Sequence, residues 1–172
     1  MINPVVNLSE YDPNWPLQFE NEKNRINEAI GNEIIGIEHI GSTSIKGLGS
    51  KPIIDIMVGV NNLNDVEALV NALNKIDFEF VPKPEITDRK FFRSRISGRS
   101  TYHLHICEFN NVEWNEKLLF RDYLRSHPEA SKEYYSLKKE LATKYHFDRS
   151  TYTKAKRPFI KNIIEKASKE KA

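Results

Sequence analysis

Cysteine is nearly absent from this 172-residue chain, whose only thiol is Cys107. A single cysteine excludes an intrachain disulfide, so the composition does not point to an oxidising compartment. No apolar run approaches the length of a membrane-spanning helix, and the first residues lack the basic start and continuous apolar segment of a signal peptide. We therefore expect a cytoplasmic protein with no membrane partner. Cys107 lies in an apolar run beside Leu104 and Ile106, which predicts a small buried residue rather than a nucleophile.

The net charge of the chain is also small, because 26 Lys and Arg residues and 24 Asp and Glu residues leave a formal net charge of +2. This balance gives no global electrostatic case for nucleic-acid binding. Hydrophobic residues make up 39% of the chain and charged residues 29%, which is typical of a globular protein. A chain of this length can bury a sizeable core.

The hydrophobic periodicity predicts strands in the first two thirds of the chain and helices around them. Short apolar or alternating runs predict strands at about 34–40, 53–58, 78–81, 90–96 and 102–108. Helical spacing predicts helices at about 14–30, 62–75, 114–125, 129–145 and 150–167, the last of them kinked or divided at Pro158. The chain therefore predicts an α/β (α+β) fold, with a sheet covered by helices and a helical C-terminal half. We expect one domain over residues 1–172, with a sheet-containing core at 14–110 and a helical part at 111–172.

The predicted strand at 34–40 ends at Gly41-Ser42-Thr43. Gly41 can adopt a positive φ or let its backbone approach a ligand closely. Ser42 and Thr43 can cap a short helix and leave N–H groups pointing outward, which makes a seat for a phosphate group. Lys51, which follows soon after, would add a positive charge there. The alternative is that Gly-Ser-Thr is an ordinary turn.

Asp55 interrupts the next apolar run, and a buried strand rarely tolerates an unpaired charge. The carboxylate therefore needs a partner, and Glu38 on the preceding strand and His105 on a later strand are candidates. His103 and His105 point the same way because side chains on a strand alternate. A carboxylate with an imidazole can bind a divalent metal or form an acid/base pair. The alternatives are a structural carboxylate at position 55 and histidines that face solvent or a polar network.

The predicted strand 90–96 carries Phe91, Arg93 and Arg95 on one face. With the strand 102–108 it forms a natural antiparallel hairpin. Two arginines on one face can grip phosphate oxygens or a carboxylate by bidentate hydrogen bonds. They can equally be solvent-side charges on a half-exposed sheet.

Taken together and in order, five stretches of the chain resemble the GrpB family of the nucleotidyltransferase superfamily: YDPNWPLQFENE, HIGSTSIKGLGSKPIIDIMV, YHLHI, FRDYLRSHPEASKEYYSLKKELA and YTKAKRPFI. The resemblance runs nearly end to end. It implies a nucleotidyltransferase-like mixed sheet flanked by helices, with Gly41-Ser42 at the Gly-Ser position of the superfamily and Asp55 as its first catalytic carboxylate. Some GrpB-like domains are fused to dephospho-CoA kinases, which suggests coenzyme metabolism.

One position departs from the pattern of the superfamily, whose active enzymes carry two carboxylates one residue apart on this strand and a third on a later strand. They use two divalent metals to organise a nucleoside triphosphate. Here the flanking positions are Ile53 and Met57, which cannot ligate Mg²⁺. His105, or Glu108 beyond it, is the nearest candidate for the later-strand ligand.

The leading hypothesis is a protein that binds a nucleotide or another phosphorylated small molecule and that acts, if it is an enzyme, as a nucleotidyl or phosphoryl transferase. In this hypothesis, the phosphates of the ligand would be faced by Gly41, Ser42, Thr43 and Lys51. Further anionic groups of the ligand would be bound by Arg93, Arg95 and His103. Asp55 and His105, with Glu38, would hold one divalent cation (Mg²⁺ or Mn²⁺) or act on a proton. The alternative is a binding or regulatory module that has lost the two-metal site.

A weaker alternative is RNA binding through the basic helical half, which contains Lys132, Lys138, Lys139, Lys144, Arg149, Lys154, Lys156 and Arg157. The acidic residues between these cations indicate a solvated helical surface instead. We therefore do not expect a nucleic-acid partner.

Overall fold

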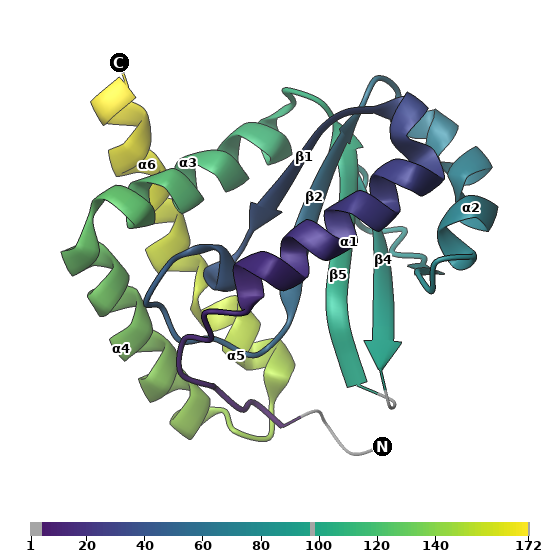
Figure 1. The fold of residues 1–172 in the computed structure, drawn as a ribbon. Coiled ribbons are helices and arrows are strands. Elements are labelled where there is room, and N and C mark those ends of the chain that lie inside the picture. The colour runs from purple at the N-terminus through teal and green to yellow at the C-terminus, as the bar shows by residue number, and fades with distance from the viewer. Residues whose placement is uncertain (1–4, 97–98, 172) are drawn as a thin grey trace.

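The fold is built around a five-stranded sheet with the strand order β1-β2-β5-β4-β3 (Figure 1). The computed structural model describes residues 5–96 and 99–171. Its strands are β1 (Ile34–Ile40), β2 (Ile54–Val60), β3 (Glu79–Val81), β4 (Arg89–Ile96) and β5 (Arg99–Glu108). β2 and β5 pair in parallel, and the other neighbouring pairs are antiparallel. The predicted mixed sheet is confirmed, and so is the hairpin of β4 and β5.

The α-helices of the described residues are α1 (Trp15–Ile30), α2 (Val70–Asn74), α3 (Val112–Ser126), α4 (Pro128–Lys144), α5 (Arg149–Ala155) and α6 (Arg157–Lys171). Figure 1 shows α1 lying across the sheet, and α3 to α6 gathered on the side of β1. The predicted helical C-terminal half is confirmed. The break between α5 and α6 falls at Lys156, directly before Arg157 and Pro158, where proline was expected to divide the helix. Within the described ranges, no helix is long and apolar enough to cross a bilayer.

The side chains of β2 alternate between two environments, because successive residues of a strand point to opposite faces of the sheet. Ile54, Ile56 and Val58 are buried in the core that α1 and α2 cover. Asp55 and Met57 lie on the other face, together with the residues of β5 that pair with them. The sheet therefore has one apolar face for the core and one face that carries polar groups.

The helix α3 covers part of that second face through Trp114. Its indole packs with Met57, Cys107 and Ile40 in a small apolar cluster. Cys107 is fully buried, as predicted, and burial raises the pKa of its thiol to about 12. The remainder of this face, where Asp55 lies, is not under Trp114.

Two local predictions differ from the structure. The segment 62–75 forms a 3-10 helix (Leu63–Leu69) before α2, and not a single α-helix. The Asn62 side chain accepts from the Asn64 N–H, and the Leu63 N–H donates to Glu108, so the entry of this segment is held by two local hydrogen bonds. The strand predicted at 102–108 begins earlier, because β5 already starts at Arg99.

The close packing of Trp114 on the sheet leads to a prediction for Gly59→Ala. A Cβ at position 59 would lie 2.9 Å from Trp114 Cζ3, and the buried indole has little room to move. We expect this overpacking to lower the free energy of unfolding by about 1–3 kcal/mol, measured by urea denaturation.

Gly31→Ala is the matched control, because Gly31 has a helical backbone with φ −55° and a Cβ there meets nothing within 4 Å. We expect it to leave stability unchanged or to raise it by up to about 1 kcal/mol. Equal losses in the two variants would contradict the proposed packing of Trp114.

Candidate functional site

The turn after β1 brings the backbone of Gly41 against the carboxylate of Asp55. Gly41 has φ +74° and ψ −177°, a conformation that is essentially confined to glycine. A Cβ at this position would lie only 2.6 Å from Asp55 Oδ2. Both the backbone and the close approach therefore require glycine. Ser42 lies inside the short 3-10 helix Ser42–Ser44 and does not cap it, because Gly41 occupies the cap position.

The register of the parallel pair β2 and β5 places two imidazoles beside Asp55. Asp55 pairs with His103, and Met57 with His105, so all four side chains share one face. His105 Nε2 lies 3.2 Å from Asp55 Oδ1, and His103 Nδ1 lies 3.7 Å from the same oxygen. The ring of Phe91 on β4 packs against both imidazoles. The predicted meeting of Asp55 with the two histidines is thus present.

Protonation follows from this environment. Burial raises the pKa of Asp55, but the hydrogen bond and the charge of His105 outweigh it and lower the pKa to about 2. Burial lowers the pKa of His103 to about 4, although Asp55 opposes that shift. At neutral pH the site therefore contains an ionised carboxylate and a neutral His103. Because a carboxylate only accepts hydrogen bonds, His105 Nε2 carries the proton of that contact.

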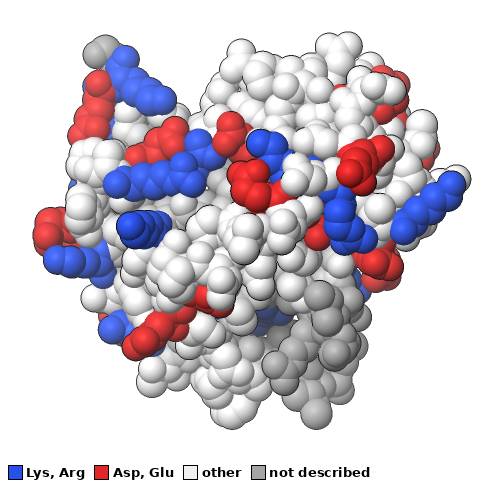
Figure 2. Space-filling view, in the orientation of Figure 1, with Lys and Arg blue, Asp and Glu red and all other residues white. Residues whose placement is uncertain are grey.

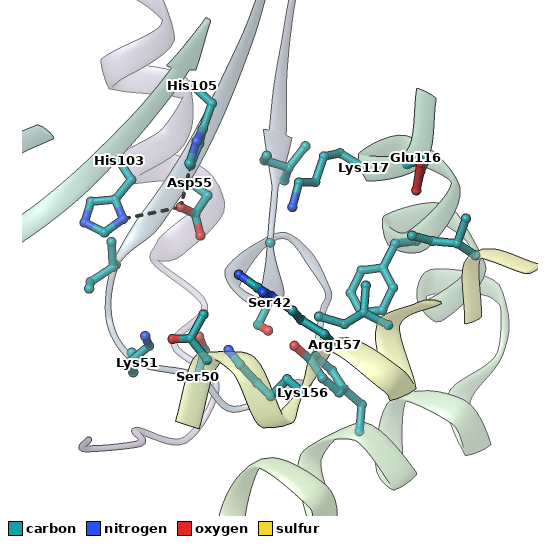
Figure 3. Close-up of a pocket in the computed structure, with 18 of the residues that line it drawn as sticks. Ser42, Ser50, Lys51, Asp55, His103, His105, Glu116, Lys117, Lys156 and Arg157 are labelled. Atoms are coloured by element: carbon teal, nitrogen blue, oxygen red, sulfur yellow. Dashed lines mark hydrogen bonds and ion pairs between the residues drawn. The ribbon is translucent and has the colours of Figure 1, made fainter. Parts of the chain in front are cut away.

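A cavity of about 570 Å³ opens between this face of the sheet and the helices α3 to α6. The Gly41-Ser42 turn, Lys51, Asp55, His103 and His105 all line it. Figure 3 shows Asp55 between the two histidines, with Lys117 and Lys156 reaching in from the helices. The walls hold seven Lys or Arg residues but three Asp or Glu residues, so the cavity is basic although the whole chain is nearly neutral.

Two predicted site residues take other roles. Thr43 is buried, and its hydroxyl lies 2.9 Å from His39 Nε2, so it is not among the residues that line the cavity. Glu38 shares the face of Asp55, but its carboxylate accepts a 2.6 Å hydrogen bond from Arg121. The Arg121 guanidinium also donates to His39 O. Glu38 therefore joins β1 to α3, and its carboxylate is already engaged.

Of the predicted arginine pair, Arg93 is described and does not line the cavity. Arg93 pairs with His103 across the hairpin, yet its Nε lies 3.7 Å from a Glu79 carboxylate oxygen. The side chain of Arg95 lies outside the described part of the structure.

Sequence reasoning missed the cations that the helices contribute. Lys138 was expected on a solvated surface, but it is 2% exposed. Its Nζ donates to Ser42 Oγ at 2.8 Å and to Gly49 O at 2.9 Å. A signal was available, because Tyr134, Lys138 and Leu141 have the spacing of a buried helical stripe.

The donor set does not fit the two-metal site that the resemblance to the nucleotidyltransferase superfamily implies. Met57 occupies the position of the second carboxylate and is buried against Trp114, and Glu38 is bound by Arg121. Among the described residues, no three His, Cys, Asp or Glu side chains are arranged to hold a metal ion. Asp55 is the remaining carboxylate on this part of the sheet, and its nearest neighbours are imidazoles.

The chain has a nucleotidyltransferase-like fold, as the solved structures reported below show, and its Gly-Ser turn and Asp55 lie where the resemblance in the sequence places them. The chain belongs to the GrpB family, since the family model described as "GrpB protein" matches residues 5–166. Glutamate-rich protein GrpB of Alkalihalophilus pseudofirmus is 39% identical over 161 residues, which cover 91% of this chain and 92% of that protein. A dephospho-CoA kinase of Mycolicibacterium paratuberculosis is 25% identical over 94% of this chain, which corresponds to 46% of the kinase.

Solved structures agree with this assignment. The crystal structure of the conserved protein GrpB from Enterococcus faecalis has a TM-score of 0.87 and 34% identity, and the match covers 95% of this chain and 98% of that chain. The MgGTP-bound structure of the Cid1 poly(U) polymerase has a TM-score of 0.53 and 13% identity, and the match covers 78% of this chain and 44% of that chain. The second similarity is one of fold.

The contact between Gly41 and Asp55 predicts a local effect for Gly41→Ala. The new Cβ would displace the Asp55 carboxylate and break its hydrogen bond with His105. We expect the ring C–H resonances of His103 and His105 to move in ¹H–¹³C NMR spectra. The positive φ should also lower the free energy of unfolding by about 1–3 kcal/mol.

Gly47→Ala separates these two effects, because Gly47 also has a positive φ (+84°) but a Cβ there meets nothing within 4 Å. It should lose similar stability and keep the histidine resonances of the wild type. Unchanged histidine resonances in Gly41→Ala would show that the position of the Asp55 carboxylate does not require glycine at position 41.

Proposed function

We propose that this cavity binds a nucleotide or another phosphorylated small molecule. The observation that carries the proposal is that the Gly41-Ser42 turn opens onto the same basic cavity as Asp55 and the two histidines. A cavity of this size is typical of small-ligand sites. Its excess of cations over carboxylates suits an anionic ligand better than a neutral one.

Ser42 is the group that we assign to the phosphate. Its Oγ accepts a hydrogen bond from Lys138, and the hydroxyl keeps its own proton to donate to a ligand oxygen. Gly41 lacks a side chain that would cover the turn. Lys51 lines the same wall and adds a positive charge beside the phosphate.

Asp55 and His105 form the pair that could act on a proton of the bound ligand. An ionised carboxylate hydrogen-bonded to an imidazole orients the ring and stabilises its protonated form, which is the arrangement used in general acid–base catalysis. If the protein transfers a nucleotidyl or phosphoryl group, this pair is the candidate for the proton transfer.

A binding or regulatory module without catalysis is the second candidate, and the burial of Met57 favours it. An enzyme of this superfamily needs a further carboxylate beside Asp55, and neither Met57 nor the Arg121-bound Glu38 provides one. Turnover of a bound nucleotide, followed by phosphate release and product chromatography, distinguishes an enzyme from a module.

The similar proteins suggest which ligands to test. Cid1 binds MgGTP in its crystal structure, and dephospho-CoA kinase is the name of a relative that contains a matching segment. Nucleoside mono-, di- and triphosphates and phosphorylated coenzyme A precursors are therefore the first panel. RNA is a less suitable candidate, because Figure 2 shows Lys and Arg interspersed with Asp and Glu on the face in view, and because the buried Lys138 is not available to a macromolecule.

The panel is tested by isothermal titration calorimetry of the wild type and of Ser42→Ala. We expect at least one phosphorylated ligand to bind, and we expect Ser42→Ala to weaken its affinity about 10-fold, since one hydrogen bond to a charged group is lost. Ser126→Ala is the control, because the Ser126 hydroxyl is exposed and bonds within its own helix. Absence of binding across the panel would refute the proposal.

The affinity should also fall as the solution becomes more alkaline. Burial, reinforced by neighbouring cations that include Arg149, lowers the pKa of Lys51 to about 7 and that of Lys156 to about 8, although Asp55 opposes both shifts. A lysine is positively charged below its pKa, so raising the pH through this range removes positive charge from the cavity and weakens the attraction for an anion. We expect a loss of about 10-fold or more between about pH 7 and pH 9, where exposed lysines stay charged.

Replacing both lysines, in Lys51→Met/Lys156→Met, should remove most of this pH dependence. A wild-type affinity that stays constant over this interval would contradict the assignment of these amino groups to the site.

A further inference from the structure

Three lysines from separate elements bring their amino groups to one side of the cavity. Lys51 precedes β2, Lys138 lies on α4, and Lys156 lies at the junction of α5 and α6; all three line the cavity. Figure 3 shows Lys51 and Lys156 on the same side of the pocket as Ser42. This arrangement places three amino groups beside the proposed phosphate site.

Aromatic rings and neutral oxygens, and not carboxylates, hold these amino groups. The Nζ atoms of Lys51 and Lys156 lie 5.5 Å and 4.6 Å from the ring centroid of the buried Tyr152. Lys138 contacts Ser42 Oγ and Gly49 O. Among the described residues, none of the three forms an ion pair with Asp or Glu. No described carboxylate therefore neutralises these amino groups at ion-pair distance.

Buried positive charges without a counterion are unfavourable, and the titration of the lysines agrees with this. Burial, with the charges of Lys156 and Lys51, lowers the pKa of Lys138 well below its usual value. An anion that enters the cavity would favour the protonated form of all three lysines. The cavity thus has the properties expected of a site whose positive charges are neutralised by a bound anionic ligand.

In a two-metal enzyme, the charge of the ligand phosphates is balanced by divalent cations held on carboxylates. Here neither Met57 nor Glu38 can serve as such a carboxylate ligand, because Met57 has no carboxylate and Glu38 is bound by Arg121. Amino groups lie beside the Gly-Ser turn instead, and a lysine can bind phosphate directly as a point charge.

We propose, resting on the function proposed above, that Lys51, Lys138 and Lys156 form a subsite that binds the phosphates of a di- or triphosphate ligand without a divalent metal. Three clustered ammonium groups match the charge of two or three linked phosphates better than that of one. The ligand phosphates would lie between the Gly41-Ser42 turn and the junction of α5 and α6. The reacting part of the ligand would then face Asp55 and the histidines.

The test is calorimetric titration of the full chain with inorganic tripolyphosphate, ATP and ADP, each in excess EDTA and again in excess MgCl₂. We expect binding in EDTA, with no tightening when Mg²⁺ is added. Lys156→Met should weaken the affinity in EDTA about 10- to 100-fold, because it removes a hydrogen bond between charged groups. Lys156→Arg should restore most of this loss, since the positive charge returns.

Lys154→Met is the matched control, because Lys154 lies one half-turn away on α5, is exposed and does not line the cavity. It should bind tripolyphosphate like the wild type. Lys138→Met and its exposed neighbour Lys139→Met repeat the comparison on α4, and circular dichroism melts confirm that each variant is folded.

The outcomes separate this subsite from the function on which it rests. Binding that requires Mg²⁺, or equal losses in Lys154→Met and Lys156→Met, would overturn the metal-independent subsite and leave phosphorylated-ligand binding in place. Failure of all phosphorylated ligands to bind, with and without Mg²⁺, would overturn both. An affinity in EDTA that is lost only when the cavity lysines are replaced would support the subsite.

Discussion

The contact of the Gly41 backbone with the Asp55 carboxylate fixes the geometry of the site. It needs a residue without a Cβ at the end of β1 and a side chain on β2 that points away from the core. It holds the Gly-Ser turn and the carboxylate within one small space. The parallel pairing of β2 with β5 then brings two imidazoles to the same carboxylate.

The opposite side of the cavity is built differently. It is made largely by helices, on which Lys138 is buried beside the Tyr134 ring and the Gly49 carbonyl and Lys156 is half-buried beside the Tyr152 ring. Asp55 and the imidazoles lie on the sheet, while the helices contribute most of the lysines and arginines together with Glu113 and Glu116. A ligand between the two walls would meet an acid/base pair on one side and positive charge on the other, which is the separation that a phosphorylated molecule with one reacting end requires.

Local sequence pattern indicated the residues on the sheet side of the cavity, whereas those on the helical side depend on long-range packing. Alternation shows that His103 and His105 share one face of their strand, but the parallel pairing of β2 with β5 and its register, which place both imidazoles beside Asp55, come from the structure. Nothing local shows that Glu38 is bound by Arg121, which lies 83 positions away in the chain. Helical spacing marks Lys138 as buried, but its contact with Ser42 depends on how α4 packs against the sheet. The charged character of Lys138 alone therefore did not predict its burial.

The packing of the helical half also explains the departure from the two-metal pattern. Trp114 covers Met57 on the same face of the sheet that carries Asp55, so a carboxylate at position 57 would lie in an apolar cluster and would be costly to ionise. The same helical half brings Lys138 and Lys156 to the turn that faces Asp55. The helix that covers Met57 thus belongs to the same part of the chain that supplies Lys138 and Lys156. The cover over Met57 and the lysines beside the turn are thus both supplied where the helical half packs against the sheet, and phosphate binding without a second carboxylate would depend on those lysines.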